Sequence, residues 1–152
     1  MYFAIKPLKG VGPIEFGMTS LQVKNIMKGY CGAKFNHSEW EGVDYFFGNA
    51  IEVSYDSEGK VNFIVSQYYP HCGCNFVLYD TDPFDTDAKK LFTVIKDQSN
   101  DSHEFNPDGY LFEEKVIILW ESDKENDYKG SETRSIYGQV GIGNSNYLMS
   151  IS

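Results

Sequence analysis

Two stretches of the chain repeat their apolar residues at helical spacing. In the first, Val23, Ile26 and Met27 follow Thr19, whose hydroxyl can accept from the free N–H groups of a first helical turn. This pattern predicts a short amphipathic helix over residues 19–28.

The second stretch predicts a helix near residues 86–97, with Asp85 or Thr86 as the N-cap. Its apolar stripe consists of Ala88, Leu91, Phe92 and Ile95.

Alternating apolar and aromatic residues predict strands in much of the remaining chain. The expected strands are Met1–Ile5, Val43–Phe47, Ile51–Tyr55, Val61–Gln67, Asn75–Tyr79, Tyr110–Phe112, Val116–Trp120, Ser135–Ile142 and Tyr147–Ile151. A turn at residues 56–60, where Gly59 is free to take positive φ, predicts a hairpin. The polar stretches 97–109 and 121–134 are expected to be loops.

Five strand positions recur 65 residues later in the chain. Tyr45, Phe47, Ile51, Val53 and Tyr55 correspond to Tyr110, Phe112, Val116, Ile118 and Trp120. Coincidence among aromatic-rich strands is the alternative explanation. We interpret the match as a duplication, with pseudo-repeats near residues 10–68 and 80–151 in one domain over residues 1–152. The predicted fold is α+β: an antiparallel sheet built from two tandem helix-plus-strands units, with the helices packed on one face.

Composition and charge narrow the possible partners. The 152 residues include 13 basic and 22 acidic side chains, for a formal net charge of −9. A nucleic-acid backbone would be repelled by this charge, whereas a basic protein would be attracted. No apolar run approaches the length of a membrane span, so we expect a cytoplasmic protein that does not bind membranes. In a reducing cytosol the three cysteines, Cys31, Cys72 and Cys74, are expected to be free thiols.

Candidate chemistry is sparse. His71–Cys74 has one residue between its cysteines, whereas structural zinc sites usually have two to four. The glycines at 10, 12 and 17 do not form a phosphate-binding motif. The acidic residues from Asp80 onward do not have the spacing of a calcium loop. We therefore predict no metal, no cofactor and no catalytic residue, and expect that the chain is not an enzyme.

The segment Gly10–Thr19 carries a resemblance to known proteins. It reads Gly-Val-Gly-Pro-Ile-Glu-Phe-Gly-Met-Thr and resembles a signature in a family of small, largely uncharacterised bacterial proteins. The later segments Ile51–Asp56, Gly59–Ile64 and Tyr110–Trp120 are similar to that family as well. The resemblance implies an immunity protein, which neutralises a toxin through protein–protein contact. The expected layout is also similar to that of the β-lactamase inhibitor protein, whose concave sheet face clamps an enzyme.

We therefore expect a binding protein that inhibits a cognate toxin through exposed aromatic and acidic residues, and the net charge of −9 favours a basic toxin. The candidate interface residues are Glu39, Trp40, Glu41, Tyr68, Tyr69, Asp80 and Asp82. One alternative is a domain that binds a small molecule or peptide on the aromatic sheet face. An enzyme with an unrecognised site is the other. The sequence carries no expectation about oligomeric state.

Overall fold

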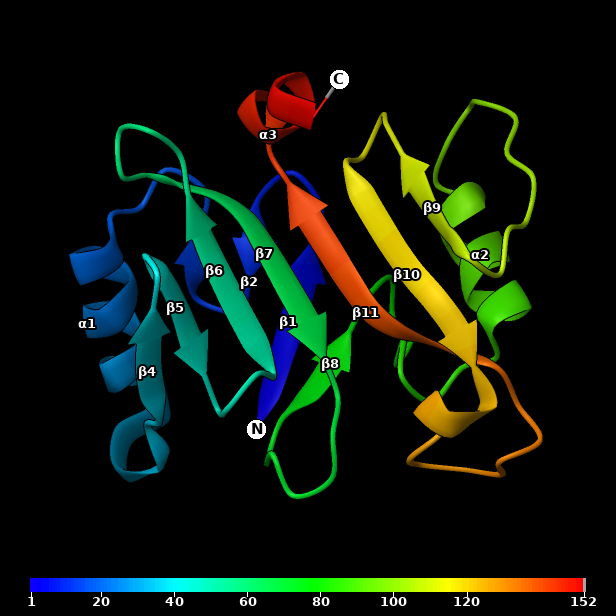
Figure 1. Ribbon diagram of the computed structural model, residues 1–152, viewed down its shortest axis with the longest axis horizontal. Helices are drawn as coiled ribbons and strands as arrows, with labels where there is room; N and C mark the ends of the chain where they lie inside the picture. Colours follow the sequence, from blue (N-terminus) through cyan, green and yellow to red (C-terminus); the bar gives the residue numbers. More distant parts are fainter. Residues whose placement is uncertain (152) are drawn as a thin grey trace.

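The computed structural model describes residues 1–151, which form an α+β fold with one large and one small sheet (Figure 1). The large sheet is antiparallel throughout. Its seven strands are, in spatial order, β4 (His37–Trp40), β5 (Val43–Phe46), β6 (Ile51–Tyr55), β7 (Val61–Gln67), β11 (Ile136–Gly143), β10 (Ile117–Asp123) and β9 (Gly109–Phe112). The small sheet is mixed and consists, in order, of β3 (Ile14–Glu15), β2 (Gly10–Val11), β1 (Tyr2–Lys6) and β8 (Asn75–Val77).

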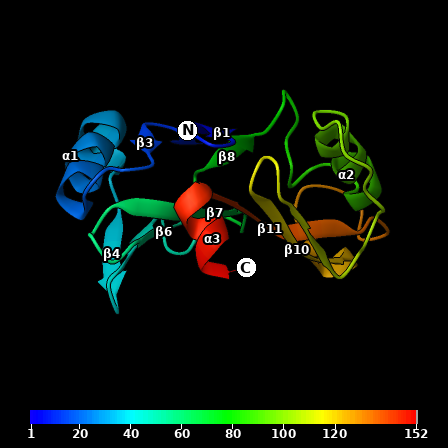
Figure 2. The ribbon, with the colours of Figure 1, turned by 90° about the horizontal axis from the view of Figure 1, so that it is seen from above.

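One face of the large sheet is covered and the other is largely open (Figure 2). The helices α1 (Ser20–Cys31) and α2 (Ala88–Lys96) lie on the covered side, with the small sheet between them. The core fills the space between these layers, because each element turns its apolar side inward. Its largest fully buried side chains include Phe3, Phe46, Phe76, Phe92, Phe112 and Ile64.

The third helix, α3 (Ser145–Ile151), corrects the prediction that all helices pack on one face. Its Tyr147 ring stacks on Phe63 of β7 at 4.0 Å between ring centres. Phe63 points away from the core, because its strand neighbour Ile64 points into it. The prediction of a strand over Tyr147–Ile151 was also wrong, since α3 occupies these residues. The Asn144 side chain accepts from the N–H of Tyr147 and so favours a helical turn there.

The first helix begins as predicted, with Thr19 as its N-cap. The Thr19 hydroxyl accepts from the N–H of Gln22, and the Gln22 side chain accepts from the N–H of Thr19. This reciprocal pair is a capping box. The helix continues through Gly29 to Cys31, because buried Met27 and Cys31 extend its apolar side.

The N-cap of the second helix was predicted one or two residues too early. Asp87 caps α2 by accepting from the N–H of Lys89. Thr86 instead donates its hydroxyl to the Asp82 carbonyl, which holds the preceding loop.

Several short strands escaped the sequence analysis. The glycine-rich segment at residues 10–15 forms β2 and β3, and β4 lies in a polar stretch with no alternating pattern. The predicted first strand does form, but β1 pairs in parallel with β8, outside the large sheet. The pairing of β1 with β8 joins residues 73 positions apart, such as Tyr2 and Asn75, so local pattern carries little information on it.

The 65-residue offset between the halves is out of register by one residue. On the covered face, Phe46 lies opposite Ile51, and Phe112 lies opposite Ile117. Both pairs are buried, and they are 66 residues apart along the chain. An offset of 65 matches buried Val53 with the half-buried Ile118 instead. Because strand side chains alternate between faces, this single-residue error exchanges inward and outward positions.

Candidate functional site

The open face of the large sheet carries a row of large side chains across three neighbouring strands, β7, β11 and β10. Gln139 of β11 lies opposite Gln67 of β7 on one side and Trp120 of β10 on the other. The Gln139 amide donates to the Gln67 side chain at 2.7 Å. Neighbouring strands thus place residues from both halves of the chain side by side.

An aromatic cluster lies beside this row. The rings of Phe63 and Trp120 meet edge to face at 6.1 Å above Gly141. A Cβ at Gly141 would lie 2.6 Å from atoms of both rings, so only glycine leaves room for their contact. Tyr147 of α3 covers the other side of Phe63, which leaves Trp120 half-buried at the border of the open surface.

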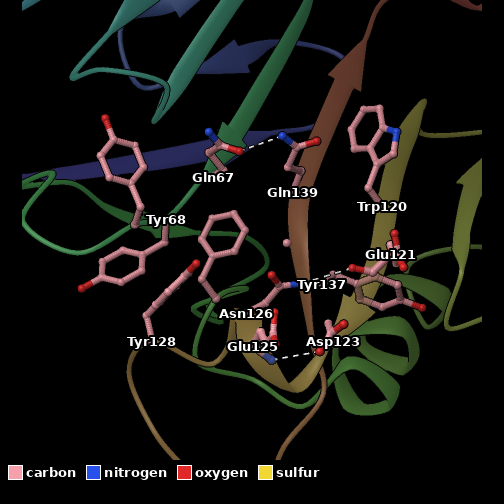
Figure 3. A pocket seen from close by; sticks show the side chains of 13 residues that line it. Gln67, Tyr68, Trp120, Glu121, Asp123, Glu125, Asn126, Tyr128, Tyr137 and Gln139 are labelled. Carbon is pink, nitrogen blue, oxygen red and sulfur yellow. Dashed lines mark hydrogen bonds between the residues drawn. The ribbon is translucent and has the colours of Figure 1, made fainter. Parts of the chain in front are cut away.

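A groove of about 540 Å³ begins at Trp120 and runs across the ends of β7, β11 and β10 (Figure 3). Its walls combine three kinds of side chain. Aromatic rings come from Tyr68, Tyr69, Phe84, Trp120, Tyr128 and Tyr137; carboxylates from Glu121, Asp123 and Glu125; and amides from Gln67, Asn126 and Gln139. Among the residues that line the groove there is no lysine, arginine or histidine.

Three predicted interface residues lie in or beside this groove. Tyr68 and Tyr69 line it, and Asp82 lies next to Tyr68 through a shared contact with Lys129. The Lys129 ammonium lies 2.6 Å from an Asp82 oxygen and 4.5 Å from the centre of the Tyr68 ring. Tyr69 also has a structural role, because its hydroxyl donates to the Phe47 carbonyl.

The other predicted residues lie elsewhere. Glu39, Trp40 and Glu41 form the end of the β4–β5 hairpin, at the edge of the large sheet away from the groove (Figure 1). Glu41 and Gly42 both have positive φ, as a tight two-residue hairpin requires. The Trp40 side chain is 67% exposed. Asp80 is exposed in a turn between β8 and α2.

Sequence reasoning missed Glu52, which lies on the open face between the hairpin and the centre of the sheet. Glu52 pairs with Tyr45 on β5 and with Val65 on β7. Its side chain is half-buried, and this burial raises the pKa of Glu52. It takes part in none of the ion pairs found within residues 1–151. In the sequence, Glu52 alternates with the apolar residues Ile51 and Val53. This alternation indicates that Glu52 points to the opposite face of the strand.

A buried carboxylate, Asp44, joins α1 to the sheet on the covered side. It accepts hydrogen bonds from the Ser20 hydroxyl at 2.6 Å, the Tyr55 hydroxyl at 2.5 Å and His37 Nε2 at 2.7 Å. Burial alone raises the pKa of Asp44, but these three hydrogen bonds outweigh burial and hold that pKa below its ordinary value.

A second histidine–carboxylate cluster fixes the loop that follows α2. His103 Nε2 donates to Glu114 at 2.7 Å, and its Nδ1 lies 2.7 Å from the Tyr110 hydroxyl. The His103 ring also packs against Phe112 at 4.9 Å between ring centres. The cluster therefore joins residues 97–108 to β9 and to the turn that follows it.

The three cysteines, Cys31, Cys72 and Cys74, are free thiols. Cys31 and Cys74 are buried, and Cys72 is half-buried beside a second cavity near the N-terminus. Burial is the main reason that the pKa of Cys74 is raised to about 12, so its thiol stays protonated at neutral pH. No three His, Cys, Asp or Glu side chains within residues 1–151 form a group that could hold a metal ion.

Comparison with protein-family models, curated proteins and solved structures finds no match for this chain. The resemblances described from the sequence therefore stay expectations. Among the helices of residues 1–151, none combines the length and apolar character needed to cross a bilayer.

Proposed function

We propose that this chain is a binding protein, and specifically an immunity protein that neutralises a bacterial toxin by direct contact. In this proposal the open face of the large sheet meets the partner. The observation that carries it is a set of carboxylates on that face and its groove, at Glu52, Glu121, Asp123 and Glu125, none of which takes part in the ion pairs of residues 1–151. The exposed Tyr128 and the half-buried Trp120 lie beside them. Aromatic anchors with charged surroundings are typical of protein interfaces.

The charge of the chain supports a basic partner. A net charge of −9 would accelerate the approach of a basic toxin over long distances. The exposed Trp40 at the hairpin and the half-buried Trp120 at the groove would then serve as two separate contact points. The resemblance of Gly10–Thr19 to a family of small, largely uncharacterised bacterial proteins, which implies an immunity protein, favours the same function.

This proposal assigns the two histidine–carboxylate clusters a structural role. His37 and Asp44 join α1 to the sheet, and His103 and Glu114 hold the loop after α2. Catalysis is not needed to account for either of them, and for this reason we favour a binding protein over an enzyme.

A second candidate function is the binding of a small molecule or peptide. The groove volume of about 540 Å³ lies within the usual range of ligand sites, and its walls offer both rings and amides. Because the groove opens onto the sheet face, a peptide would suit it better than a fully enclosed small molecule.

We also propose that the chain is a single domain that arose from two tandem units. Each half has a helix followed by antiparallel strands, and the pairs Phe46–Ile51 and Phe112–Ile117 are spaced alike within them. The two halves would then meet at the pairing of β7 with β11.

Co-expression with the product of the adjacent gene tests the immunity function. That product is expected to arrest growth alone, and growth should recover when this chain is produced with it. A toxic neighbour that is neither neutralised nor bound would refute the proposal. A harmless neighbour that does not co-purify would count against it as well.

A further inference from the structure

We propose that the groove binds an arginine side chain of the partner, with its guanidinium between the aromatic rings and the carboxylates. The inference rests on the proposed function, because it names the chemistry that the partner would present. The proposed arginine site lies in the groove, and the hairpin at Trp40 is not part of it.

Three carboxylates line the groove. Glu121, Asp123 and Glu125 are exposed, and none of them takes part in the ion pairs of residues 1–151. Asp123 Oδ1 accepts from the N–H of Glu125, which leaves its second oxygen available. The lining contains three carboxylates and no basic residue, and the nearby Lys129 is paired with Asp82, so negative charge in the groove remains for a cation to neutralise.

The aromatic walls suit the same ligand. The Tyr68 and Tyr128 rings lie 6.3 Å apart at an angle of 48°, and Trp120 forms part of the wall on another side (Figure 3). The electron-rich face of such rings attracts cations. Lys129 already lies 4.5 Å from the Tyr68 ring centre, so a cation–π contact forms next to the groove within the chain itself.

The amides indicate which cation is preferred. Asn126 uses its amide nitrogen to donate to the carbonyls of Glu121 and Ile136, and Gln139 uses its own to donate to Gln67. Their carbonyl oxygens therefore add acceptors to those of the carboxylates. A guanidinium has five donors and no acceptor, and its flat face stacks on aromatic rings. It therefore matches the groove better than an ammonium does.

Trp120 supplies a direct readout, because the chain has two tryptophans and Trp40 can be replaced. The variant Trp40→Phe leaves Trp120 as the fluorescent reporter in the groove. We would titrate this protein with the blocked peptide Gly-Arg-Gly-Arg-Gly and with matched peptides that carry citrulline or lysine in place of arginine. Citrulline keeps the shape of arginine and removes its charge.

The arginine peptide should change the Trp120 emission saturably, and the citrulline peptide should bind roughly tenfold more weakly or worse. The substitutions Glu121→Gln and Glu125→Gln should each weaken arginine binding roughly two- to fivefold. Glu58→Gln is the matched control, since this exposed residue lies in the turn before β7, at the opposite end of that strand from the groove.

Equal binding of the arginine and citrulline peptides, or no change in Trp120 emission, would overturn the inference. Equal binding of the lysine peptide would overturn the preference for guanidinium. The outcomes also separate the two proposals. Toxin neutralisation without peptide binding would refute the groove inference alone, and peptide binding without neutralisation would refute the immunity function alone.

Discussion

The Ser20 hydroxyl donates to Asp44 at 2.6 Å and so links the first turn of α1 to the interior of the large sheet. Asp44 is 1% exposed and accepts two further hydrogen bonds, from Tyr55 and His37. A buried carboxylate with three donors stabilises the fold only while it is ionised.

The ionisation of Asp44 should therefore be visible in the pH dependence of stability. Because its pKa is lowered in the folded state, its contribution is present above the ordinary pKa of about 4 and is lost as pH falls through the folded value. Asp44→Asn should lower the free energy of unfolding at pH 7 by about 1–3 kcal/mol.

Urea unfolding at pH 7 and at pH 3 would check this expectation. The difference in the free energy of unfolding between wild type and Asp44→Asn should be smaller at pH 3 than at pH 7. The exposed Glu58→Gln variant should show no such pH-dependent difference. A gap between wild type and Asp44→Asn that is the same at both pH values would contradict the role given to this carboxylate.

The hairpin residues should affect binding without affecting the fold. Trp40 is 67% exposed, so Trp40→Ala should change the free energy of unfolding by less than about 0.5 kcal/mol. The double change Glu39→Lys and Glu41→Lys should slow association with a basic toxin and flatten its dependence on salt. Stopped-flow association at several salt concentrations would measure this, and unchanged rates would show that these residues lie outside the interface.

Arg134 should hold the long loop between β10 and β11 in place. Its guanidinium donates to buried Asp127 at 2.9 and 2.6 Å and to Asp85 at 2.8 Å. Hydrogen bonds from Arg134 are the main reason that the pKa of Asp127 is lowered. Arg134→Gln leaves this carboxylate without its cation, and the Tm should fall.

Limited proteolysis would locate the effect of this substitution. Cleavage within residues 124–135 should become faster in Arg134→Gln. The cleavage rate of Arg134→Lys should lie between those of Arg134→Gln and wild type, because lysine keeps the charge but not the planar pair of donors. Equal cleavage rates in all three proteins would mean that the ion pairs do not order this loop.

The thiols should differ in reactivity. At pH 8 an alkylating reagent should modify native Cys72 first, since Cys31 and Cys74 are buried and the pKa of Cys74 is raised to about 12. Mass spectrometry of the native protein should show one rapid addition, and Cys72→Ser should abolish it. Rapid modification of Cys74 would contradict its burial.

Local pattern was sufficient for several parts of this protein. The helical stripe after Thr19 and the turn at residues 56–60 are encoded within a few residues, and both form as predicted. The sequence likewise predicted an α+β fold with an antiparallel sheet, because alternation and helical spacing report directly on which side of an element is apolar. Tyr68 and Tyr69, named from the sequence as candidate interface residues, both line the groove, and their role in binding stays a prediction.

Tertiary structure decided the rest. The groove forms only because β7 and β11 pair, which brings Gln67 beside Gln139 across 72 positions and places Trp120 next to them. The parallel pairing of β1 with β8, and the packing of Tyr147 on Phe63, are also contacts between distant segments. A pattern read along the chain assigns a residue to one face of its own element. Which residues of other elements share that face depends on strand order and register, and these are set by packing over the whole domain.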